Sequence, residues 1–555
     1  MNTNNIVIVD VGSTTTKALL FQYKEETWHY RERGEAATTV EAPDEDVMLG
    51  VWRALQTLSD RSGVPLVTEG QLICDAFLAT SSAGGGLQMV VCGNISHVTG
   101  ESAKRAALGG GAVLLDLFTV DDGRHHFHRL ERLRTLRPDM ILLSGGIEGA
   151  QNINFMIEMC DFIRIAKPKP KFGYHHRLPV VYAGASRAIP VVEELLSEDF
   201  HLKVVPNLRP TMDGENLAPT REAIHELFIE HVMSHAPGYH HLQELVTHPL
   251  LPTPSAVGEI LTRYARQVDS NILCIDIGGA TTDIFSVVEG RYVRSVSANL
   301  GMSYSIGNVV ATTGLENILH WLSPDLSLTQ VKRSIGAKLF HPISIPATTT
   351  DLLVEQAVAR EAIRLAFQDH RELATIQAPR SIFVSELLLQ PGQIHVDAFD
   401  IIIGSGGVLC NAPERHQATL MLLDALQPCG VTKLYVDSVF MLPHLGVFAM
   451  MDESSALSAL RQDCLVPLGT VIAPWGTPRG GAVALRLQGS TSQGSSFDIT
   501  VPGGRVEMIP LAAEESANLE ITLSGGATWH GPRRFVVTGG DSGIIIDTRG
   551  RPPQN

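Results

Sequence analysis

No uninterrupted apolar run in the 555-residue sequence approaches the roughly 18 residues that a membrane-spanning helix needs. The seven cysteines are scattered and form no Cys-x-x-Cys pair, which argues against a structural zinc site and is typical of a reducing compartment. With 43 Lys+Arg against 59 Asp+Glu, the net charge of −16 argues against general binding to nucleic acid or anionic membranes. The N-terminal MNTNNIVIVD has no basic region before a long apolar stretch, so we expect no signal peptide. We therefore expect a cytoplasmic protein.

Histidine clusters are the feature that invites a metal interpretation. They occur in DDGRHHFHRL, KFGYHHRLP and APGYHHLQE, which have the composition of polar loops. The sequence lines up no third or fourth ligand at metal spacing around these pairs. We therefore favour solvated loop histidines over a metal site.

The alternation of short apolar runs with helical patterns indicates an α/β protein. Val-, Ile- and Leu-rich runs such as AVLLDLF at 112–118 and LPVVYAG at 178–184 are separated by glycine turns and amphipathic segments. From about residue 480 the texture changes: residues 483–547 alternate apolar and polar positions between glycine-rich turns. This pattern predicts a small all-β domain at the C-terminal end.

One short pattern occurs twice. IVIVDVGSTTTKALLF at 6–21 returns as ILCIDIGGATTDIFSV at 272–287, and aligning Asp10 with Asp276 gives a separation of 266 residues. The glycine at offset +2 and the threonines at offsets +5 and +6 are then identical, namely Gly12 and Gly278, Thr15 and Thr281, Thr16 and Thr282. Each copy reads as a β-hairpin whose glycine permits a tight turn and lets the backbone approach a ligand closely.

The polar residues of these hairpins suit polyphosphate and magnesium. Free N–H donors at the tip, with the hydroxyls of Ser13, Thr14, Thr15 and Thr16 in one copy and of Thr281 and Thr282 in the other, make a nest for phosphate oxygens. Asp10 and Asp276 end the inward strands, where a carboxylate can hold Mg²⁺ through water or orient an attacking water. A single hairpin is explained by ordinary turn chemistry, whereas two facing copies can clamp a polyphosphate.

A third glycine-rich element completes the set. FDIIIGSGGVL at 399–409 is a buried strand that ends in Gly404, Ser405, Gly406 and Gly407 before a helix. Such a turn offers a nucleoside a flat surface near a helix N-terminus. The order of hairpin, hairpin and glycine-rich turn resembles the actin, sugar-kinase and heat-shock-chaperone ATPases. The resemblance implies a phosphate-1 motif from Asp10 to Lys17, a phosphate-2 motif from Asp276 to Asp283, including Gly279 and Ala280, and an adenosine motif from Gly404 to Gly407.

Two observations leave alternatives open. PDMILLSGGIEGA at 138–150 resembles the 400–407 turn but lies between the two hairpins, out of order, so we interpret it as a βα turn of an inserted domain or else as a second ligand turn. Lys17 can reach the β- or γ-phosphate. Because Asp283 occupies the matching place in the other copy, both are alternatively lobe-specific surface residues.

Segments spread over most of the chain indicate one particular family among these ATPases. DVGSTTTKALLF, ATSSAGGGLQMVV, ILLSGGIEGA, VVYAGASRAIPVVEELL, NLGMSYSIG and VTGGDSGIIIDTRGRP together resemble the GlmL/MutL family of glutamate-mutase accessory proteins. The resemblance implies an ATP- and Mg-binding protein, with weak ATPase activity, that reactivates or chaperones an adenosylcobalamin-dependent carbon-skeleton mutase. Two alternatives remain, a small-molecule kinase, for which Asp116, Asp121 and Asp122 are open as bases, and a non-hydrolysing nucleotide-dependent scaffold.

These inferences predict a duplicated actin-like (ribonuclease-H-like) two-lobe ATPase fold. We expect residues 1–81 to form the first lobe with the phosphate-1 hairpin, and residues 82–255 to form an inserted α/β region that includes any remainder of that lobe. Residues 256–480 then form the second lobe with the phosphate-2 and adenosine motifs, and residues 481–555 the β-rich domain. The gap between the hairpins exceeds one ordinary lobe, and the extra domain is the expected contact surface for a partner enzyme.

Overall fold

A computed structural model shows two compact units, each with a mixed β-sheet covered by helices. The first unit runs to Arg263 and also contains Leu442–Ala459, while the second begins at Tyr264 and holds the rest of the described chain. The structure describes residues 4–12, 15–40, 44–68, 70–82, 87–170, 177–212, 214–228, 230, 237–297, 299–303, 305–342, 344–374, 394–476 and 478–551.

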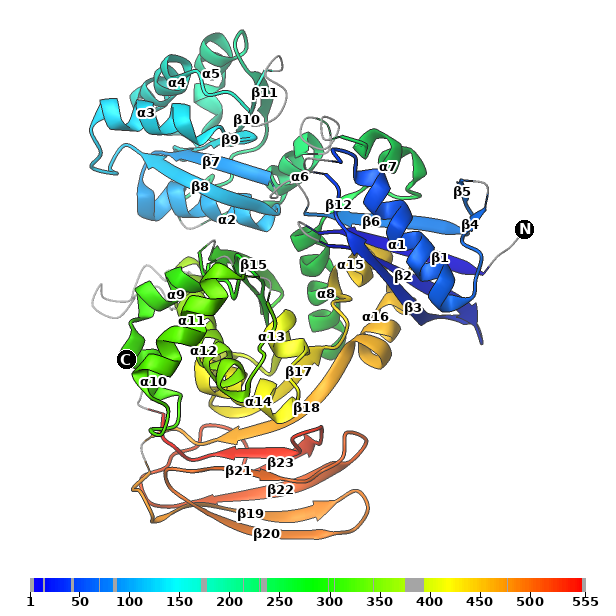
Figure 1. Cartoon of the computed structure of the whole chain (residues 1–555). Coiled ribbons are helices and arrows are strands. Elements are labelled where there is room, and N and C mark those ends of the chain that lie inside the picture. Colours follow the sequence, from blue (N-terminus) through cyan, green and yellow to red (C-terminus); the bar gives the residue numbers. More distant parts are fainter. Residues whose placement is uncertain are drawn as a thin grey trace. The chain divides into compact units, whose positions relative to one another are not determined.

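The first unit contains a five-stranded sheet of order β12-β6-β1-β2-β3 (Figure 1). Strands β1, β2 and β3 form an antiparallel meander, β6 pairs in parallel with β1, and β12 pairs in parallel with β6. Helix α1 (Val47–Ser62) packs against β3 where Gly34 leaves room: a Cβ there would lie 2.3 Å from the Ala54 carbonyl oxygen. The strand bounds are β1 Asn5–Val11, β2 Thr15–Lys24, β3 Thr27–Ala37, β6 Ala76–Ser81 and β12 Leu251–Pro252.

The second unit repeats this arrangement. Five strands of its eight-stranded sheet follow the order β15-β14-β13-β16-β17, with the same antiparallel meander and the same two parallel additions. Asp10 lies opposite Lys17 in the first meander, as Asp276 lies opposite Asp283 in the second. The two units therefore share one topology and register, which is the duplicated actin-like fold. The bounds are β13 Ile272–Ile277, β14 Thr282–Val288, β15 Arg291–Ser297, β16 Ile401–Ser405 and β17 Gly430–Asp437.

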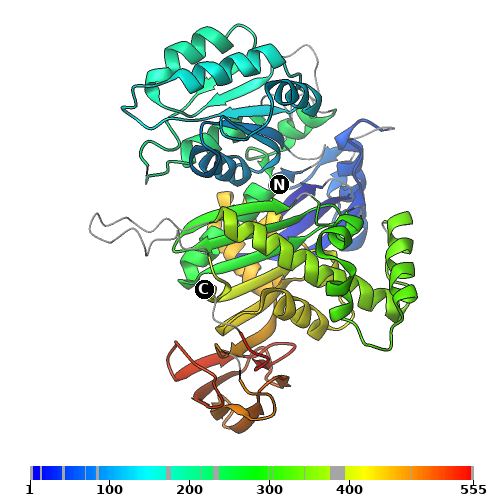
Figure 2. The same ribbon diagram turned by 90° about the vertical axis from the view of Figure 1, so that its left-hand side faces the viewer.

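A separate five-stranded parallel sheet follows β6 in the first unit, in the order β11-β10-β9-β7-β8. Its residues alternate between two cores: Met89 and Val91 face α2 and the first sheet, while Val90 and Cys92 face α3, α4 and α5. Figures 1 and 2 show these helices on the two faces of the sheet. The bounds are β7 Leu87–Gly93, β8 Ala112–Thr119, β9 Met140–Leu143, β10 Pro179–Tyr182, β11 His201–Val204, α2 Glu101–Gly109, α3 His126–Leu136, α4 Asn154–Ala166 and α5 Ile189–Leu196.

The chain returns from this insert to the first sheet through two helices. Helix α6 (Ala218–Leu227) packs on α2, and α7 (Tyr239–Leu245) leads to β12, which pairs with β6. Helix α8 (Thr253–Val268) then leads to β13 of the second unit. Residues 237–252 therefore belong to the first sheet's surroundings and not to the insert's own sheet.

The sequence expectation placed all of 256–480 in the second lobe, but residues 256–263 and a later pair of helices belong to the first unit. Helices α15 (Leu442–Met451) and α16 (Glu453–Ala459) belong to the first unit and pack on β6 and β3. The Phe448 ring lies 5.2 Å from the Phe21 ring, and Gly446 fits against Ala256, whose carbonyl oxygen would be 1.9 Å from an added Cβ. An apolar helix does not encode which sheet it covers, so the sequence alone could not assign it.

The C-terminal region is β-rich and divides between two sheets. A four-stranded antiparallel sheet of order β20-β19-β22-β23 packs around Leu485, Leu487, Ile521 and Val537. Strands β21 (Val506–Ile509) and β24 (Ile544–Asp547) instead extend the large sheet of the second unit through β18 (Leu465–Ala473). The bounds of the smaller sheet are β19 Val483–Thr491, β20 Ser496–Pro502, β22 Ser516–Leu523 and β23 Arg534–Thr538.

Helices of the second unit cover its sheet beside the two motifs. The long α12 packs on β13, β14 and β15, and α9 and α11 pack on α12. Among the described residues, no helix has the length and apolarity needed to cross a bilayer. The bounds are α9 Ile306–Thr313, α10 Leu315–His320, α11 Leu328–Phe340, α12 Thr349–Leu373, α13 Gly407–Cys410 and α14 Arg415–Leu426.

Candidate functional site

Asp10 is held in one orientation at the end of β1. Its Oδ1 accepts hydrogen bonds from Thr80 Oγ1 at 2.8 Å and from Thr253 Oγ1 at 2.7 Å, and the residue is 7% exposed. Thr80 is its neighbour on the parallel strand β6, whereas Thr253 comes from the start of α8. Because two hydroxyls fix one carboxylate oxygen, the carboxylate is oriented before any ligand arrives.

The tip of the first hairpin is a tight turn. The Gly12 N–H donates to the Thr15 carbonyl oxygen at 3.1 Å, and a Cβ on Gly12 would lie 2.7 Å from that oxygen. Thr38 Oγ1 donates to the Gly12 carbonyl at 2.8 Å and lies 3.0 Å from Oγ1 of the buried Thr16. Thr15 is half-buried. Ser13 and Thr14, both predicted phosphate ligands, lie outside the described residues.

Lys17 and Asp283 occupy matching positions in different surroundings. Lys17 lies in register between Asp10 on β1 and Glu35 on β3. Asp283 instead accepts two hydrogen bonds from Arg294, at 2.9 Å from Nε and 2.6 Å from Nη2, and Arg294 is 3% exposed. The carboxylate of Asp283 is therefore committed to its own sheet, and the phosphate role of Lys17 remains a proposal.

The second hairpin is tied to the segment after β15. The Gly278 N–H donates to the Thr281 carbonyl at 2.9 Å, as its counterpart does in the first copy. Backbone N–H groups of Met302 and Ser303 donate to the Gly278 and Gly279 carbonyls at 2.9 and 2.8 Å, and the buried Thr282 donates through Oγ1 to the Leu300 carbonyl. We call residues 299–303 the strap. The strap fixes the tip of the hairpin and leaves Gly279 and Ala280 exposed and Thr281 half-buried.

The second hairpin and the glycine-rich turn meet directly. Asp276, which is half-buried, pairs with Ser405 on the parallel strand β16. Gly406 follows with φ 99° and ψ 155°, and a Cβ there would lie 2.2 Å from the Ile277 carbonyl oxygen. Gly404 is buried against Leu422, while Gly407 opens α13 and is exposed. Two of the predicted motifs therefore form one surface of the second unit.

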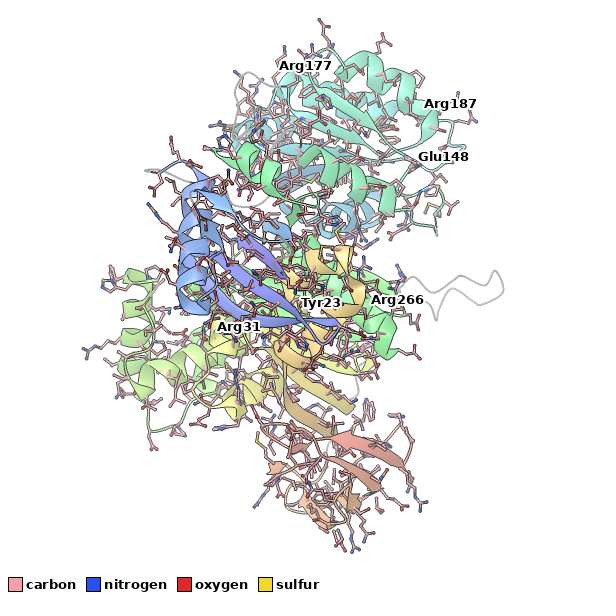
Figure 3. The ribbon with its side chains drawn as sticks, turned by 90° about the vertical axis from the view of Figure 1, so that its right-hand side faces the viewer. Tyr23, Arg31, Glu148, Arg177, Arg187 and Arg266 are labelled. Carbon is pink, nitrogen blue, oxygen red and sulfur yellow. The ribbon has the colours of Figure 1, made fainter. Side chains whose placement is uncertain are left out.

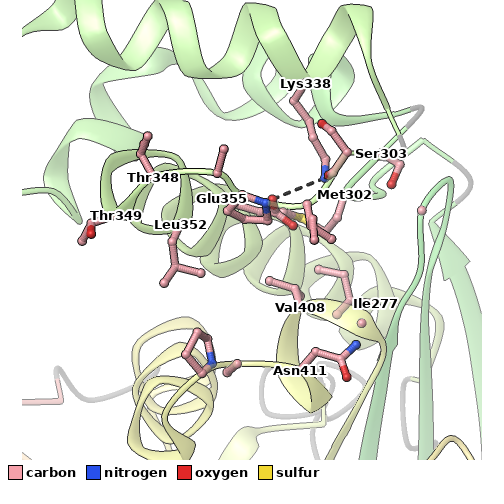
Figure 4. A pocket seen from close by; sticks show the side chains of 18 of the residues that line it. Ile277, Met302, Ser303, Lys338, Thr348, Thr349, Leu352, Glu355, Val408 and Asn411 are labelled. Atoms are coloured by element: carbon pink, nitrogen blue, oxygen red, sulfur yellow. Dashed lines mark hydrogen bonds and ion pairs between the residues drawn. The ribbon is translucent and has the colours of Figure 1, made fainter.

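That surface borders a cavity of about 630 Å³ (Figure 4). Gly278, Gly279 and Gly407 were predicted site residues, and they line it together with the strap, α11, the start of α12 and α13. Apolar walls come from Met302, Leu352 and Val408, and the polar lining residues include Ser303, Lys338, Ser344, Thr348, Thr349, Glu355 and Asn411. The volume lies within the usual range of small-molecule sites, roughly 300–1,000 Å³.

An ion pair in this cavity was missed by sequence reasoning. Lys338 Nζ lies 3.3 Å from Glu355 Oε2, with side chains 13% and 16% exposed, and it also donates to the Ser344 carbonyl. Burial raises the pKa of the Glu355 carboxyl, and the Lys338 charge opposes that shift. Figure 4 shows this pair on one side of the cavity and Asn411 on the other. The pairing joins two helices, so no local sequence signal marks it.

The carboxylates left open for a kinase are engaged within the insert. Asp116 accepts from Arg124 Nη1 and Arg132 Nε, both at 3.0 Å, and Asp122 pairs with Arg124 and Arg129. Asp121 accepts from the Ser96 backbone N–H and Oγ, both at 2.9 Å. Desolvation raises the pKa of Asp121, but hydrogen bonding to the carboxylate outweighs it, so the pKa is lowered. Each of these groups is thus explained by local structure.

The out-of-order SGG turn follows strand β9 of the insert's sheet and precedes α4. Gly145 and Gly146 have φ 156° and 77°, and Glu148 accepts from Ser186 and from Asn207 Nδ2, the latter at 2.8 Å. Figure 3 shows Glu148 and Arg187 close together at the surface of the insert. The turn is a βα connection at the carboxyl edge of a parallel sheet.

Two sets of residues have donor chemistry for a metal. Asp10 and Asp276 offer carboxylate oxygens, which suit Mg²⁺ held through water. Among the described residues, His240, His241 and Glu244 are also grouped, with ligand atoms within 4.8 Å of one another on the exposed face of α7. The expectation of loop histidines is wrong for this pair, which lies in α7, and Glu244 is a candidate third ligand because the helix brings positions i and i+4 together.

The family comparison agrees with the family resemblance found in the sequence. A family model described as MutL protein matches residues 6–464. Protein MutL of Clostridium tetanomorphum is 26% identical over 475 residues, which cover 80% of this chain and 95% of that protein. Among solved structures, nucleotide-free acetone carboxylase aligns at 12% identity and a TM-score of 0.32, covering 90% of this chain and 81% of that one. Glycerol dehydratase reactivase aligns at 11% identity and a TM-score of 0.27, covering 75% and 94%.

Proposed function

The chain belongs to the MutL protein family, and on that premise we propose that it is an ATP-binding accessory protein for an adenosylcobalamin-dependent carbon-skeleton mutase such as glutamate mutase. In this proposal the protein is a weak ATPase that reactivates or chaperones the mutase. The observation that supports nucleotide binding best is the cavity lined by Gly278, Gly279 and Gly407, because the phosphate-2 and adenosine motifs meet there. These two motifs follow one another in the sequence as they do in the actin-like ATPases.

The nucleoside would occupy the cavity of the second unit. Met302, Leu352 and Val408 offer apolar faces for a base, and Lys338, Glu355 and Asn411 offer donors and acceptors for its edge or for ribose hydroxyls. The exposed tip residues Gly279 and Ala280, with Thr281, would present N–H and hydroxyl donors to phosphate oxygens. The first hairpin, from Gly12 to Lys17, is proposed to contact phosphate as well.

Asp10 and Asp276 are proposed to do the chemistry of hydrolysis. Mg²⁺, when bound, would neutralise charge on the phosphates. Asp276 at the mouth of the second hairpin would hold metal-bound water. Asp10, oriented by Thr80 and Thr253, would position the attacking water or accept a proton from it. Orientation of a carboxylate before the reaction avoids reorganisation during it.

A kinase is the less favoured alternative. Phosphoryl transfer to an acceptor requires a carboxylate base that can reach its hydroxyl. Asp116 and Asp122 are instead paired with arginines, and Asp121 is held by Ser96. A non-hydrolysing scaffold would also bind nucleotide, and only the absence of ATP turnover would distinguish it from the proposed ATPase.

The test combines calorimetry with phosphate release. Wild-type protein should bind Mg-ATP and Mg-ADP, and Lys338→Met should weaken binding about tenfold because the buried Glu355 carboxylate loses its partner and the ligand loses a donor. Lys332→Met on the exposed side of the same helix is the matched control and should bind like wild type. Phosphate release that rises with glutamate mutase but not with candidate hydroxyl acceptors would favour the accessory role. A folded sample without adenine-nucleotide binding would overturn the proposal.

A further inference from the structure

The connection between α11 and α12 exposes large apolar side chains. Phe340 is 84% exposed, Ile345 is 86% exposed and Leu339 is 49% exposed. Helix α11 ends at Phe340 and α12 begins at Thr349, so the three residues lie at one end of the helix pair. We call Leu339, Phe340 and Ile345 the α11–α12 tip. Adjacent exposed apolar side chains of this size are typical of an interaction site.

The tip lies in a segment whose charge has the opposite sign to the chain. Between Asp325 and Asp351 the sequence contains no acidic residue, although the whole chain has a net charge of −16. Lys332 and Arg333 on α11 are exposed, and neither forms an ion pair with any residue that the structure describes. Arg333 precedes Phe340 by seven residues, which is about two turns or ~10 Å along the same face of α11. The apolar tip and these exposed cations together complement an acidic surface with an apolar groove.

The same connection forms a wall of the nucleotide cavity. Ile345 and Pro346 line both the 630 Å³ cavity and a neighbouring one of about 250 Å³. Lys338 binds the Ser344 carbonyl and pairs with Glu355 of α12, so it fixes this connection to the cavity floor. A ligand that contacts Lys338 or Ile345 therefore acts on residues adjoining the exposed Phe340.

We propose that the α11–α12 tip docks a partner protein through an acidic surface with an apolar groove, and that nucleotide in the cavity changes the affinity of this docking. The inference rests on the proposed function, since it takes the partner to be the mutase, and it adds a contact surface outside the insert. A protein is favoured over an anionic membrane because a membrane is an extended negative surface that would face much more of this chain, whose net charge is −16, than a partner docked at the tip alone.

Coupling between the two sites requires a difference in affinity. A ligand shifts docking only if it binds the docked and free states unequally, and typical couplings change affinity by roughly 5- to 150-fold. Lys338 lies two residues before Phe340 and binds the Ser344 carbonyl, so a ligand that displaces Lys338 would move the connection that carries the tip and would bind the two arrangements unequally. The reciprocal effect follows: the docked partner changes nucleotide affinity by the same factor.

The experiment uses the full chain and purified glutamate mutase. Calorimetry first establishes Mg-ATP binding for wild type, Phe340→Ser and Arg333→Glu, neither of which replaces a cavity residue. Mutase affinity is then measured by biolayer interferometry with ATP, with ADP and without nucleotide. Phe340→Ser and Arg333→Glu should each weaken mutase binding about tenfold or more, because an anchor or a complementary charge is lost. Val536→Ser, 58% exposed on β23, is the matched control and should bind like wild type.

The outcomes separate this inference from the proposed function. Wild-type protein that binds ATP but not the mutase would remove the mutase role and this docking site together. Mutase binding that is unchanged by Phe340→Ser and Arg333→Glu would overturn the tip alone and leave the accessory role standing. Equal mutase affinities with ATP, ADP and no nucleotide would overturn the coupling. Binding of wild type to phosphatidylserine vesicles that is lost in both variants, without an effect on the mutase, would assign the tip to membranes and overturn the proposal.

Discussion

Replacing Gly406 by alanine tests the contact that joins the glycine-rich turn to the second hairpin. Gly406 has φ 99° and ψ 155°, a region that is essentially restricted to glycine. An added Cβ would lie 2.2 Å from the Ile277 carbonyl oxygen and 2.8 Å from the Ile277 nitrogen and carbonyl carbon. All three are backbone atoms of β13, so no side-chain rotation relieves the overlap.

The expected cost follows from two terms. Holding alanine in this backbone region costs about 1–3 kcal/mol. Forcing a methyl group into a packed contact costs a further ~1–3 kcal/mol, since β13 and β16 must separate. We therefore expect a loss of about 4 kcal/mol. At roughly 2–4 °C per kcal/mol for a unit of this size, the melting temperature should fall by about 8–16 °C.

Gly407→Ala is the matched control one residue away. Its nearest non-neighbouring atom to an added Cβ is Asn411 Nδ2 at 3.9 Å, and it begins α13, where alanine is tolerated. Differential scanning fluorimetry and circular dichroism should show a stability near wild type for Gly407→Ala and a large loss for Gly406→Ala. Calorimetry at 15 °C should show weakened ATP binding by any folded Gly406→Ala protein. A Gly406→Ala protein that melts within a degree of wild type would refute the reasoning.

Three further predictions concern hydrolysis, pH and docking. Asp10→Ala and Asp276→Ala should each stay folded and lose metal-dependent phosphate release by about a hundredfold or more, and wild-type rates in both would contradict their roles. Burial lowers the pKa of His370 to about 3, against 6.5 for an ordinary histidine. The folded state therefore favours the neutral imidazole, and the stability that comes from keeping it neutral is fully present above pH 6.5 and is lost as pH falls toward 3. Urea unfolding should show a loss of about 2 kcal/mol at pH 5 that His370→Gln abolishes, and identical pH profiles for the two proteins would exclude His370 as the cause. Phe127→Ser, 71% exposed on α3, should weaken mutase binding without changing ATP affinity if the insert docks the partner, whereas unchanged mutase binding would argue against the insert as a docking surface.

The two hairpins and the glycine-rich turn could be predicted from the sequence because strand alternation and turn chemistry are local. Aligning Asp10 with Asp276 predicted equivalent hairpins, and the ladders place Lys17 and Asp283 opposite them in the same register. The SGG turn at 144–146 was correctly read as belonging to a βα unit, since it follows a short buried strand and precedes a helix. Each of these inferences used residues close together in the chain.

Contacts between residues distant in sequence were decided only by the tertiary structure. Asp10 is oriented by Thr80, 70 residues away, and by Thr253, 243 residues away. Lys338 and Glu355 pair in the cavity lining although they lie on separate helices, and α15 covers the first unit's sheet although it follows β17 of the second. The sequence by itself determined which turns exist and which residues they carry, because backbone geometry and hydrogen bonding within a hairpin are set locally. Which side chains surround those turns depended on the packing of helices whose apolar faces are compatible with more than one partner.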